Sequence, residues 1–129
     1  MMLLDRVLKN EGFKPKSYLD SLGVWTIGHG LTHITREESK AIVDARLKCY
    51  AKNLKDKKPW IAKYPVEVRE IIVEMNFQLG TTATNKFKKM FVALKKKDFK
   101  LAAAEMRDSK WFHQTPERCE RLAKRMGKA

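Results

Sequence analysis

The apolar positions of this chain repeat first with a helical period, then with the period of a hairpin, and then with a helical period again. Residues 2–11 carry Leu3, Leu4, Val7 and Leu8 on one face, which predicts a short amphipathic helix. Gly12 follows at the position where a positive-φ residue commonly ends a helix. Residues 13–30 hold two short β-prone runs around Ser21-Leu22-Gly23, and this pattern predicts a hairpin with a glycine in its loop.

From Thr35 onward, helical spacing continues to the end of the chain. Thr35 and Glu38 form a T-x-x-E capping box, and the helix that it opens is expected to stop at Lys57-Lys58-Pro59. Pro65 suits the first position of a second helix, which Gly80 would end. The remaining predicted helices contain, in turn, Phe87, Met90, Phe91 and Leu94; Leu101, Ala102 and Met106 after an Asp98 cap; and Thr115-Pro116-Glu117 as an N-terminal cap.

These elements predict an α+β fold in which helix dominates: one helix, a small antiparallel hairpin, and then about five helices. A chain of 129 residues fits a single domain, residues 1–129. The long helix at 36–55 would join a small hairpin lobe, about residues 13–34, to a larger helical lobe. A cleft flanked by the two lobes is where we expect a ligand to bind.

The positive charge of the chain is concentrated in its C-terminal third. The whole chain has 28 Lys and Arg against 15 Asp and Glu, a formal net charge of +13. Residues 86–129 alone hold 14 basic and 5 acidic side chains, a net charge of +9. Such a surface should attract a polyanion, and nucleic acid, anionic lipid and bacterial envelope polymers are all candidates.

Membrane insertion and secretion are not expected. No apolar run approaches the roughly 20 residues that cross a bilayer, and Asp5 interrupts the apolar N-terminus before any cleavage site. The protein is therefore expected to fold in the cytoplasm. Cys49 and Cys119 lack a CxxC partner and are expected to be buried or half-buried free thiols, while a disulfide between them stays open.

Glu11 is the first candidate for chemistry. It would fall in the last turn of the first helix, where its carboxylate faces the negative end of the helix dipole. That position disfavours the charged form of the side chain and so suits a general acid. A solvated glutamate at a frayed helix end is the alternative that position alone leaves open.

Asp20 and Thr26 flank the hairpin loop and are the second candidate pair. If the loop has three residues, Asp20 pairs with Val24, and side chains 20, 24 and 26 share one face of the hairpin. A carboxylate beside a hydroxyl can then hold a water molecule and take its proton. A two-residue loop would put Thr26 on the other face, and a turn-forming Asp with a β-prone Thr is the alternative.

Taken together, these residues occur in a recognisable pattern. Glu11-Gly12, Tyr18-Leu19-Asp20 and Trp25-Thr26-Ile27-Gly28-His29-Gly30 closely resemble the phage-type lysozymes, glycoside hydrolase family 24. Two later segments, Asn76 to Gly80 and Lys110 to Arg118, resemble further segments of that family in the same order. The resemblance covers most of the chain and implies a lysozyme-like fold.

The resemblance also implies an activity. Such enzymes are muramidases, which hydrolyse the β-1,4 bond between N-acetylmuramic acid and N-acetylglucosamine in peptidoglycan. By this likeness Glu11 is the general acid, and Asp20 and Thr26 position and activate the attacking water. No metal or organic cofactor is implied. The protein is expected to be a monomer. It would leave the cytoplasm of the host bacterium only on release or injection, and its expected partners are then peptidoglycan and anionic envelope polymers.

Other positions take roles from the same resemblance. Phe77 and Gln78 match a segment that lines the sugar cleft, and Arg118 matches an arginine that lies close to the catalytic glutamate. Gln114 belongs to the same segment as Arg118, and Leu31 is expected at the lip of the cleft.

Two departures from the family pattern stand out in the hairpin region. His29 stands between Gly28 and Gly30, whereas the T-even enzymes place their histidine after the second glycine. A structural or exposed role is expected for His29, with a substrate contact as the alternative. The segment between Thr32 and Thr35 is short, so we expect a smaller hairpin lobe.

Three alternative functions remain. A nucleic-acid-binding module would explain the charge and the Lys95-Lys96-Lys97 run, but no recognition-helix or RNA-binding signature is present. A catalytically inactive, wall-binding domain would not need Glu11, Asp20 and Thr26. A membrane disruptor could act through Arg118, Arg121, Lys124 and Arg125, yet docking of the same helix into the core explains its apolar residues better.

Overall fold

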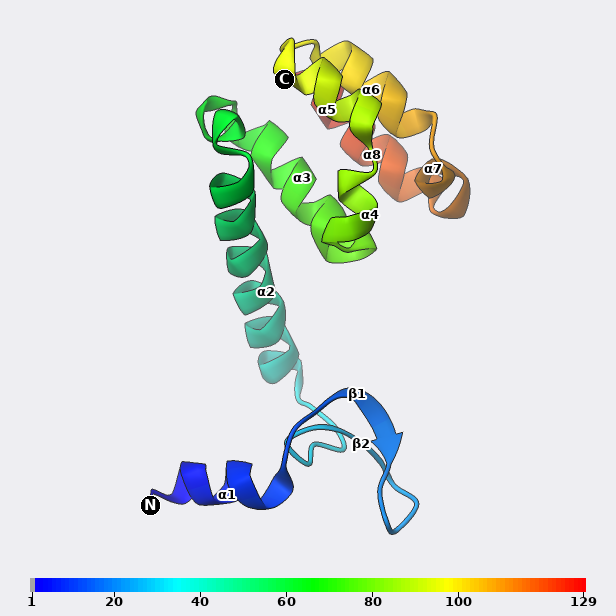
Figure 1. The fold of residues 1–129 in the computed structure, drawn as a ribbon. Coiled ribbons are helices and arrows are strands. Elements are labelled where there is room, and N and C mark those ends of the chain that lie inside the picture. Colours follow the sequence, from blue (N-terminus) through cyan, green and yellow to red (C-terminus); the bar gives the residue numbers. More distant parts are fainter. Residues whose placement is uncertain (1) are drawn as a thin grey trace. The chain divides into compact units, whose positions relative to one another are not determined.

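The computed structural model describes residues 2–129, which divide into two compact units. Residues 2–42 belong to the hairpin unit, and residues 43–129 form the helical unit. The hairpin unit contains α1 (Leu3–Glu11), β1 (Lys14–Leu19), β2 (Trp25–Gly28) and the first turns of α2 (Arg36–Lys57) (Figure 1). The mostly helical α+β fold class is confirmed.

Helix α1 ends where the pattern of apolar residues predicts. Gly12 adopts a positive φ of 68°, a conformation that L side chains rarely adopt, and its N–H donates to the carbonyl of Leu8. Glu11 is therefore the last residue of the helix. Leu3, Leu4 and Val7 form an exposed apolar stripe along α1.

The hairpin has the three-residue loop that was one of two predicted alternatives. Asp20 and Val24 are joined by an Asp20 N–H to Val24 O bond of 2.9 Å, and Leu19 pairs with Trp25 beyond them. The N–H of Gly23 closes the loop by donating to the carbonyl of Asp20 at 3.0 Å. Strand β1 begins at Lys14, and its pairing with β2 is irregular between Lys14 and Tyr18.

The predicted capping box at the start of α2 is confirmed. The N–H of Glu38 donates to Thr35 Oγ1 at 3.1 Å, and the N–H of Thr35 donates to Glu38 Oε1 at 2.9 Å. Hydrogen bonding to Thr35, first of all from its backbone N–H, holds the pKa of the Glu38 carboxyl below its ordinary value. At its other end α2 stops at Lys57, and the 3₁₀ helix η1 (Pro59–Lys63) follows.

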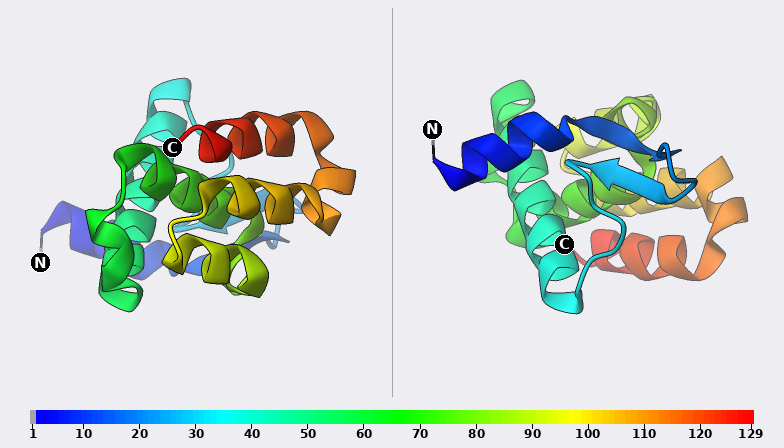
Figure 2. Two further views of the ribbon diagram at one scale, coloured as in Figure 1. Left: turned by 90° about the horizontal axis from the view of Figure 1, so that it is seen from above. Right: turned by 90° about the horizontal axis from the view of Figure 1, so that it is seen from below.

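The helical unit is built from the end of α2, η1 and six further α-helices. These are α3 (Val66–Leu79), α4 (Thr81–Asn85), α5 (Lys88–Lys95), α6 (Phe99–Arg107), α7 (Lys110–Gln114) and α8 (Pro116–Gly127). Helix α6 packs against both α5 and α8 (Figure 2). As predicted, the Asp98 side chain caps α6 by accepting the N–H of Leu101 at 3.0 Å.

Several details of the helices were predicted wrongly. The expectation of about five helices after the hairpin misses α4, α7 and η1, because five residues are too few to establish a helical period. Pro65 is the residue before α3 and not its first residue. Thr115 precedes α8, but its hydroxyl makes no capping bond. Leu101, Ala102 and Met106 all lie in α6 as predicted, and of the three only Leu101 is exposed.

The hydrophobic core of the helical unit gathers residues from every helix except α4 and includes the apolar face of α8. Cys119, Leu122, Ala123 and Met126 of α8 are all buried, as docking into the core requires. This burial disfavours the membrane-disrupting alternative, and no helix within residues 2–129 has the length and apolarity to cross a bilayer. The other fully buried large side chains are Ile61, Val68, Ile71, Ile72, Met75, Thr84, Met90, Leu94 and Met106.

The two cysteines are both free thiols but lie in different surroundings. Cys119 is buried, and desolvation raises the pKa of its thiol to about 11, which makes it a poor nucleophile. Cys49 is exposed, which corrects the expectation of a buried or half-buried thiol at that position.

One buried polar group in the core leads to a stability prediction. Asn76 on α3 is 5% exposed, and within residues 2–129 its Oδ1 has no hydrogen-bond donor. Because an unsatisfied buried acceptor costs about 1–3 kcal/mol, Asn76→Leu should raise the free energy of unfolding by about 1 kcal/mol in urea denaturation. Asn76→Ala also removes the amide but leaves a cavity, so it should not stabilise. A stability loss in Asn76→Leu equal to that of Asn76→Ala would contradict this explanation.

Candidate functional site

The hairpin register brings two of the predicted site residues to one face. Tyr18 pairs with Thr26, Leu19 with Trp25, and Asp20 with Val24. Because side chains alternate between the faces of a strand, Asp20 and Thr26 share a face, while Leu19 and Trp25 occupy the opposite one. The predicted diagonal relation between Asp20 and Thr26 follows from this register.

Backbone donors hold the Asp20 carboxylate in place. Oδ1 accepts the N–H of Leu22 and the N–H of Val24, both at 2.9 Å. These bonds are the Asx-type contacts that stabilise a turn. Asp20 therefore does form the turn, as one of the two alternatives predicted. Both donors use the same oxygen, and among the described residues Oδ2 accepts no hydrogen bond. Oδ2 is therefore the oxygen that is free to receive a proton from water.

Thr26 is the one buried side chain in the part of the hairpin unit that the structure describes. It is 5% exposed, and its Oγ1 donates to the carbonyl of Val24 at 3.0 Å. With its proton committed to that carbonyl, the hydroxyl oxygen can act only as an acceptor toward another group. Two acceptors on one face, Asp20 Oδ2 and Thr26 Oγ1, suit a water molecule that donates both of its protons.

Glu11 reaches the hairpin through a close approach to Gly30. A side-chain carbon built on Gly30 would lie 2.8 Å from the Glu11 carboxyl carbon, closer than real Cβ atoms approach. Gly30 also has a positive φ of 74°. Gly30 therefore combines a left-handed backbone with a close approach to the Glu11 carboxyl group. Glu11 itself is exposed and among the described residues has neither a hydrogen bond nor an ion pair at its carboxylate.

The remaining residues of the hairpin unit have structural neighbours. Leu31 forms an isolated antiparallel bridge with Ile27, with hydrogen bonds of 2.8 and 2.9 Å, and is exposed. His29 is half-buried, with its ring centre 5.1 Å from that of Phe13. The expected structural role of His29 agrees with this stacking.

Gln78 occupies the centre of a hydrogen-bonded network in the helical unit. Its Oε1 accepts the indole N–H of Trp111 at 3.0 Å, and its Nε2 donates to Thr115 Oγ1 at 3.1 Å. The Thr115 hydroxyl in turn donates to the carbonyl of Trp111 at 3.4 Å. This network explains why the Thr115 side chain does not cap α8, and it fixes the orientation of the Gln78 amide.

Phe77 and Arg118 line one cavity of about 590 Å³ between α2, α3 and α8. The Nε of Arg118 donates to Glu74 Oε2 at 3.1 Å, and this ion pair is partly exposed. No local sequence signal identifies Glu74 as the partner of Arg118, because the two residues are 44 positions apart. The resemblance also places Arg118 near Glu11, and that proximity stays a prediction.

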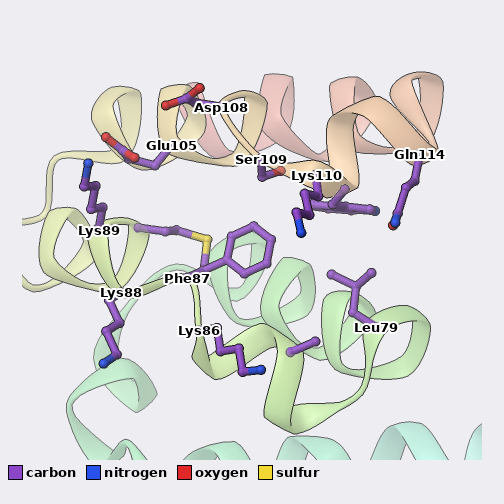
Figure 3. A pocket seen from close by; sticks show the side chains of 13 residues that line it. Leu79, Lys86, Phe87, Lys88, Lys89, Glu105, Asp108, Ser109, Lys110 and Gln114 are labelled. Carbon is purple, nitrogen blue, oxygen red and sulfur yellow. The ribbon is translucent and has the colours of Figure 1, made fainter.

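Gln114 lies in a second cavity of about 590 Å³, between the segment 79–90 and the segment 105–114. Figure 3 shows the ring of Phe87 pointing into the centre of this cavity, with Lys89 and Glu105 near one another at one side. Phe87 packs edge-on against Trp111, with 6.2 Å between ring centres. Charged side chains of both signs surround these rings: Lys86, Lys88, Lys89, Glu105, Asp108 and Lys110.

The structure therefore assembles the predicted residues in three places. Glu11, Asp20 and Thr26 lie in the hairpin unit with Leu31, while Phe77 and Arg118 share one cavity of the helical unit and Gln114 lies in another. Trp111, Lys86 and Lys89 were not predicted as lining residues, although the mixture of basic and apolar residues in 86–91 is a signal for an amphipathic surface. Among residues 2–129 there is no cluster of three or more His, Cys, Asp or Glu side chains arranged for a metal ion.

Comparisons with known proteins agree with the resemblance of the hairpin motif. The family model described as "Phage lysozyme" matches residues 8–128. "Probable T4-type lysozyme 1" of Dictyostelium discoideum is 28% identical over 151 aligned positions, which cover 92% of this chain and 89% of that protein. "Peptidoglycan hydrolase gp36" of Pseudomonas phage phiKMV is 40% identical over 52 positions, which cover 40% of this chain and 6% of that protein.

The family match extends over both units and includes every residue of the candidate site. It begins before Glu11 and ends after Arg118. The chain therefore belongs to the phage lysozyme family and is a hydrolase of the lysozyme type.

Proposed function

We propose that this protein is a muramidase that hydrolyses the β-1,4 bond between N-acetylmuramic acid and N-acetylglucosamine in bacterial peptidoglycan. The observation that carries the proposal is the pairing of Asp20 with Val24 and of Tyr18 with Thr26, which gives Asp20 and Thr26 a common face. The name of the phage phiKMV relative, a peptidoglycan hydrolase, supports the same substrate.

In this proposal Glu11 is the general acid. It protonates the glycosidic oxygen as the bond to the leaving sugar breaks. The carboxylate belongs to the last residue of α1 and lies against Gly30. Because Gly30 has no side chain, it leaves room for the carboxyl group of Glu11. Its exposure leaves the proton accessible to a substrate that arrives from solution.

Asp20 and Thr26 prepare the nucleophile. A water that donates one proton to Asp20 Oδ2 and the other to Thr26 Oγ1 keeps a lone pair for the anomeric carbon. As the new C–O bond forms, the water proton passes to Asp20, which is the general base of an inverting hydrolysis. The carboxylate also stabilises the positive charge that develops on the sugar ring in the transition state.

This arrangement predicts the stereochemistry of the product. Because the β-linked sugar is attacked by water from the opposite face, the first product should be the α anomer. Proton NMR within the first minutes of digestion, before mutarotation, reads the anomer directly. A β anomer as the first product would mean that a protein group attacks the sugar itself, which contradicts the role given to Asp20.

We also propose substrate contacts in the helical unit. Phe77 offers an aromatic face to a sugar ring, and the fixed amide of Gln78 and the exposed amide of Gln114 suit an N-acetyl group. Arg118 and Leu31 are the remaining proposed contacts. The same proposal includes peptidoglycan and anionic envelope polymers as the partners, a monomeric state, and folding in the host cytoplasm before release.

The proposal is tested by release of soluble sugar from purified, dye-labelled peptidoglycan. A muramidase releases dye in proportion to enzyme, whereas a nucleic-acid-binding module or an inactive wall-binding domain releases none. Binding to labelled walls without release of dye would favour the inactive domain and overturn the enzymatic proposal.

A further inference from the structure

One end of the helical unit carries a dense group of lysines that takes no part in the proposed chemistry. They come from two segments, residues 55–63 at the end of α2 and η1, and residues 95–100 between α5 and α6, both toward the top of Figure 1. The two segments together hold eight lysines and two aspartates, a net charge of +6. We name this surface the lysine end: Lys55, Lys57, Lys58, Lys63, Lys95, Lys96, Lys97 and Lys100.

Aromatic packing holds these two segments together. The Tyr64 hydroxyl, just after η1, donates to the carbonyl of Leu94 near the end of α5. The ring of Tyr64 lies 5.6 Å from that of Trp60 and 5.9 Å from that of Phe99, measured between ring centres, both in edge-on geometry. The lysine end is therefore a fixed feature of the folded unit, although its residues are more than 30 positions apart in sequence.

Two of the lysines lie over aromatic rings. Lys58 Nζ lies 4.6 Å from the centre of the Phe91 ring, and Lys95 Nζ lies 5.4 Å from the centre of the Trp60 ring. The Lys95 contact crosses from one segment to the other, and the Lys58 contact joins the first segment to α5, which leads into the second. These cation–π contacts position the two ammonium groups, and the N–H donors that face away from the rings stay available to an anion.

The positive charge of the lysine end is not compensated within the protein. No lysine of the group has a carboxylate within 4.0 Å among residues 2–129, and the ion pairs of the helical unit lie elsewhere: Lys48–Asp44, Arg107–Glu120, Arg118–Glu74 and Arg125–Glu67. The Asp98 carboxylate is used to cap α6. Lys97 even adopts a positive φ of 57°, at a turn position where glycine is favoured.

The nature of the charges indicates the kind of ligand. Lysine ammonium groups bind phosphates as point charges and do not require the bidentate geometry of arginine. A bilayer-binding surface would also need an apolar stripe along one helix. The exposed large apolar residues of this unit, Val66, Val92 and Leu101, come from three different helices. These features favour a flexible, phosphate-bearing chain over a lipid surface.

We propose that the lysine end binds a phosphodiester-linked anionic polymer attached to the cell wall and so holds the enzyme on its substrate. The inference rests on the proposed function, because only a wall hydrolase meets such a polymer beside its substrate. The lysine end belongs to the helical unit and shares no residue with Glu11, Asp20 and Thr26, so binding and hydrolysis can be altered by different substitutions.

The binding test uses poly(glycerol phosphate) as the probe and the full-length chain. The variant Lys57→Gln/Lys96→Gln/Lys97→Gln removes three charges that make no aromatic contact, and Lys9→Gln/Lys40→Gln/Lys124→Gln removes three elsewhere. Calorimetry should show an affinity loss of more than tenfold for the first variant, with a shallower salt dependence, and less than a threefold loss for the second. Equal losses in both variants would show that net charge alone is responsible and would overturn the proposal.

Two further arms identify the source of the phosphate. Phosphatidylglycerol vesicles and duplex DNA are each tested as ligands, at the same phosphate concentration and the same salt concentration as poly(glycerol phosphate). Tighter binding of the wild-type protein to either one than to poly(glycerol phosphate) would overturn the assignment of the partner.

A hydrolysis assay separates this proposal from the proposed function. On walls that carry phosphodiester polymers, the lysine-end variant should release sugar several-fold more slowly than its control, and on walls stripped of these polymers the two should be equal. An equal difference between the variants on both walls would contradict the tethering role. If the wild-type protein cleaves neither wall, the muramidase proposal fails, and the calorimetric result still decides whether the lysine end binds the polymer.

Discussion

Replacing Glu11 with glutamine should reduce peptidoglycan hydrolysis by roughly 10²–10⁴-fold, the usual contribution of general acid catalysis. Glutamine has nearly the shape of glutamate but has no proton to give to a glycosidic oxygen. The fold should survive, because the Glu11 carboxylate is exposed and makes no ion pair or hydrogen bond among the described residues. Turbidity loss of a permeabilised bacterial suspension measures the effect.

Glu37→Gln is the matched control for this experiment. Glu37 is an exposed carboxylate in the first turn of α2, also within the hairpin unit. Both variants lose one negative charge, so any general effect of charge on wall binding is the same in both. A folded Glu11→Gln protein that clears cells as fast as Glu37→Gln would show that Glu11 is not the acid.

The second large effect is expected from Gly30→Ala. The new methyl group would meet the carboxyl group of Glu11, and because that group ends a flexible side chain, Glu11 should move aside. A displacement of about 1 Å at a reacting group can cost roughly 10²-fold in rate. The positive φ of Gly30 adds a stability loss on the order of 1–2 kcal/mol for any L residue.

Gly80→Ala separates these two contributions. Gly80 also has a positive φ, of 86°, but nothing lies within 4 Å of a Cβ built on it. It should therefore lose a similar amount of stability in thermal unfolding and keep most of its activity. In the double variant Glu11→Gln/Gly30→Ala, the alanine should cost little further activity, since the acid is already absent. Activity losses that multiply in the double variant would contradict an effect of Gly30 through Glu11.

Local sequence signals predicted much of the hairpin unit. The end of α1 at Gly12 and the Thr35–Glu38 box depend on residues close in sequence, so their patterns could be recognised directly. The register of the hairpin could only be narrowed to two alternatives, because a single residue in the loop moves Thr26 from one face to the other. The Asp20–Val24 hydrogen bond decides between them.

Features that depend on distant residues could not be predicted from one sequence. The Gln78 amide bonds to Trp111 and Thr115, more than 30 positions away, and nothing in the local pattern of Thr115 distinguishes this role from a helix cap. The lysine end likewise forms only when η1 meets the end of α5. Its lysines look like ordinary solvated positions when each segment is considered separately.

The identity of the new reducing ends tests the central claim most directly. Purified peptidoglycan is digested, reduced with borohydride and hydrolysed in acid, with the Glu11→Gln protein as the blank. Hydrolysis of the proposed bond creates new reducing ends of N-acetylmuramic acid, which borohydride then reduces. Muramitol should therefore rise with digestion while glucosaminitol stays at the level of the blank. A rise in glucosaminitol would identify a glucosaminidase, and a 1,6-anhydro sugar in place of a reducing end would show that water is not the nucleophile; either result would contradict the account.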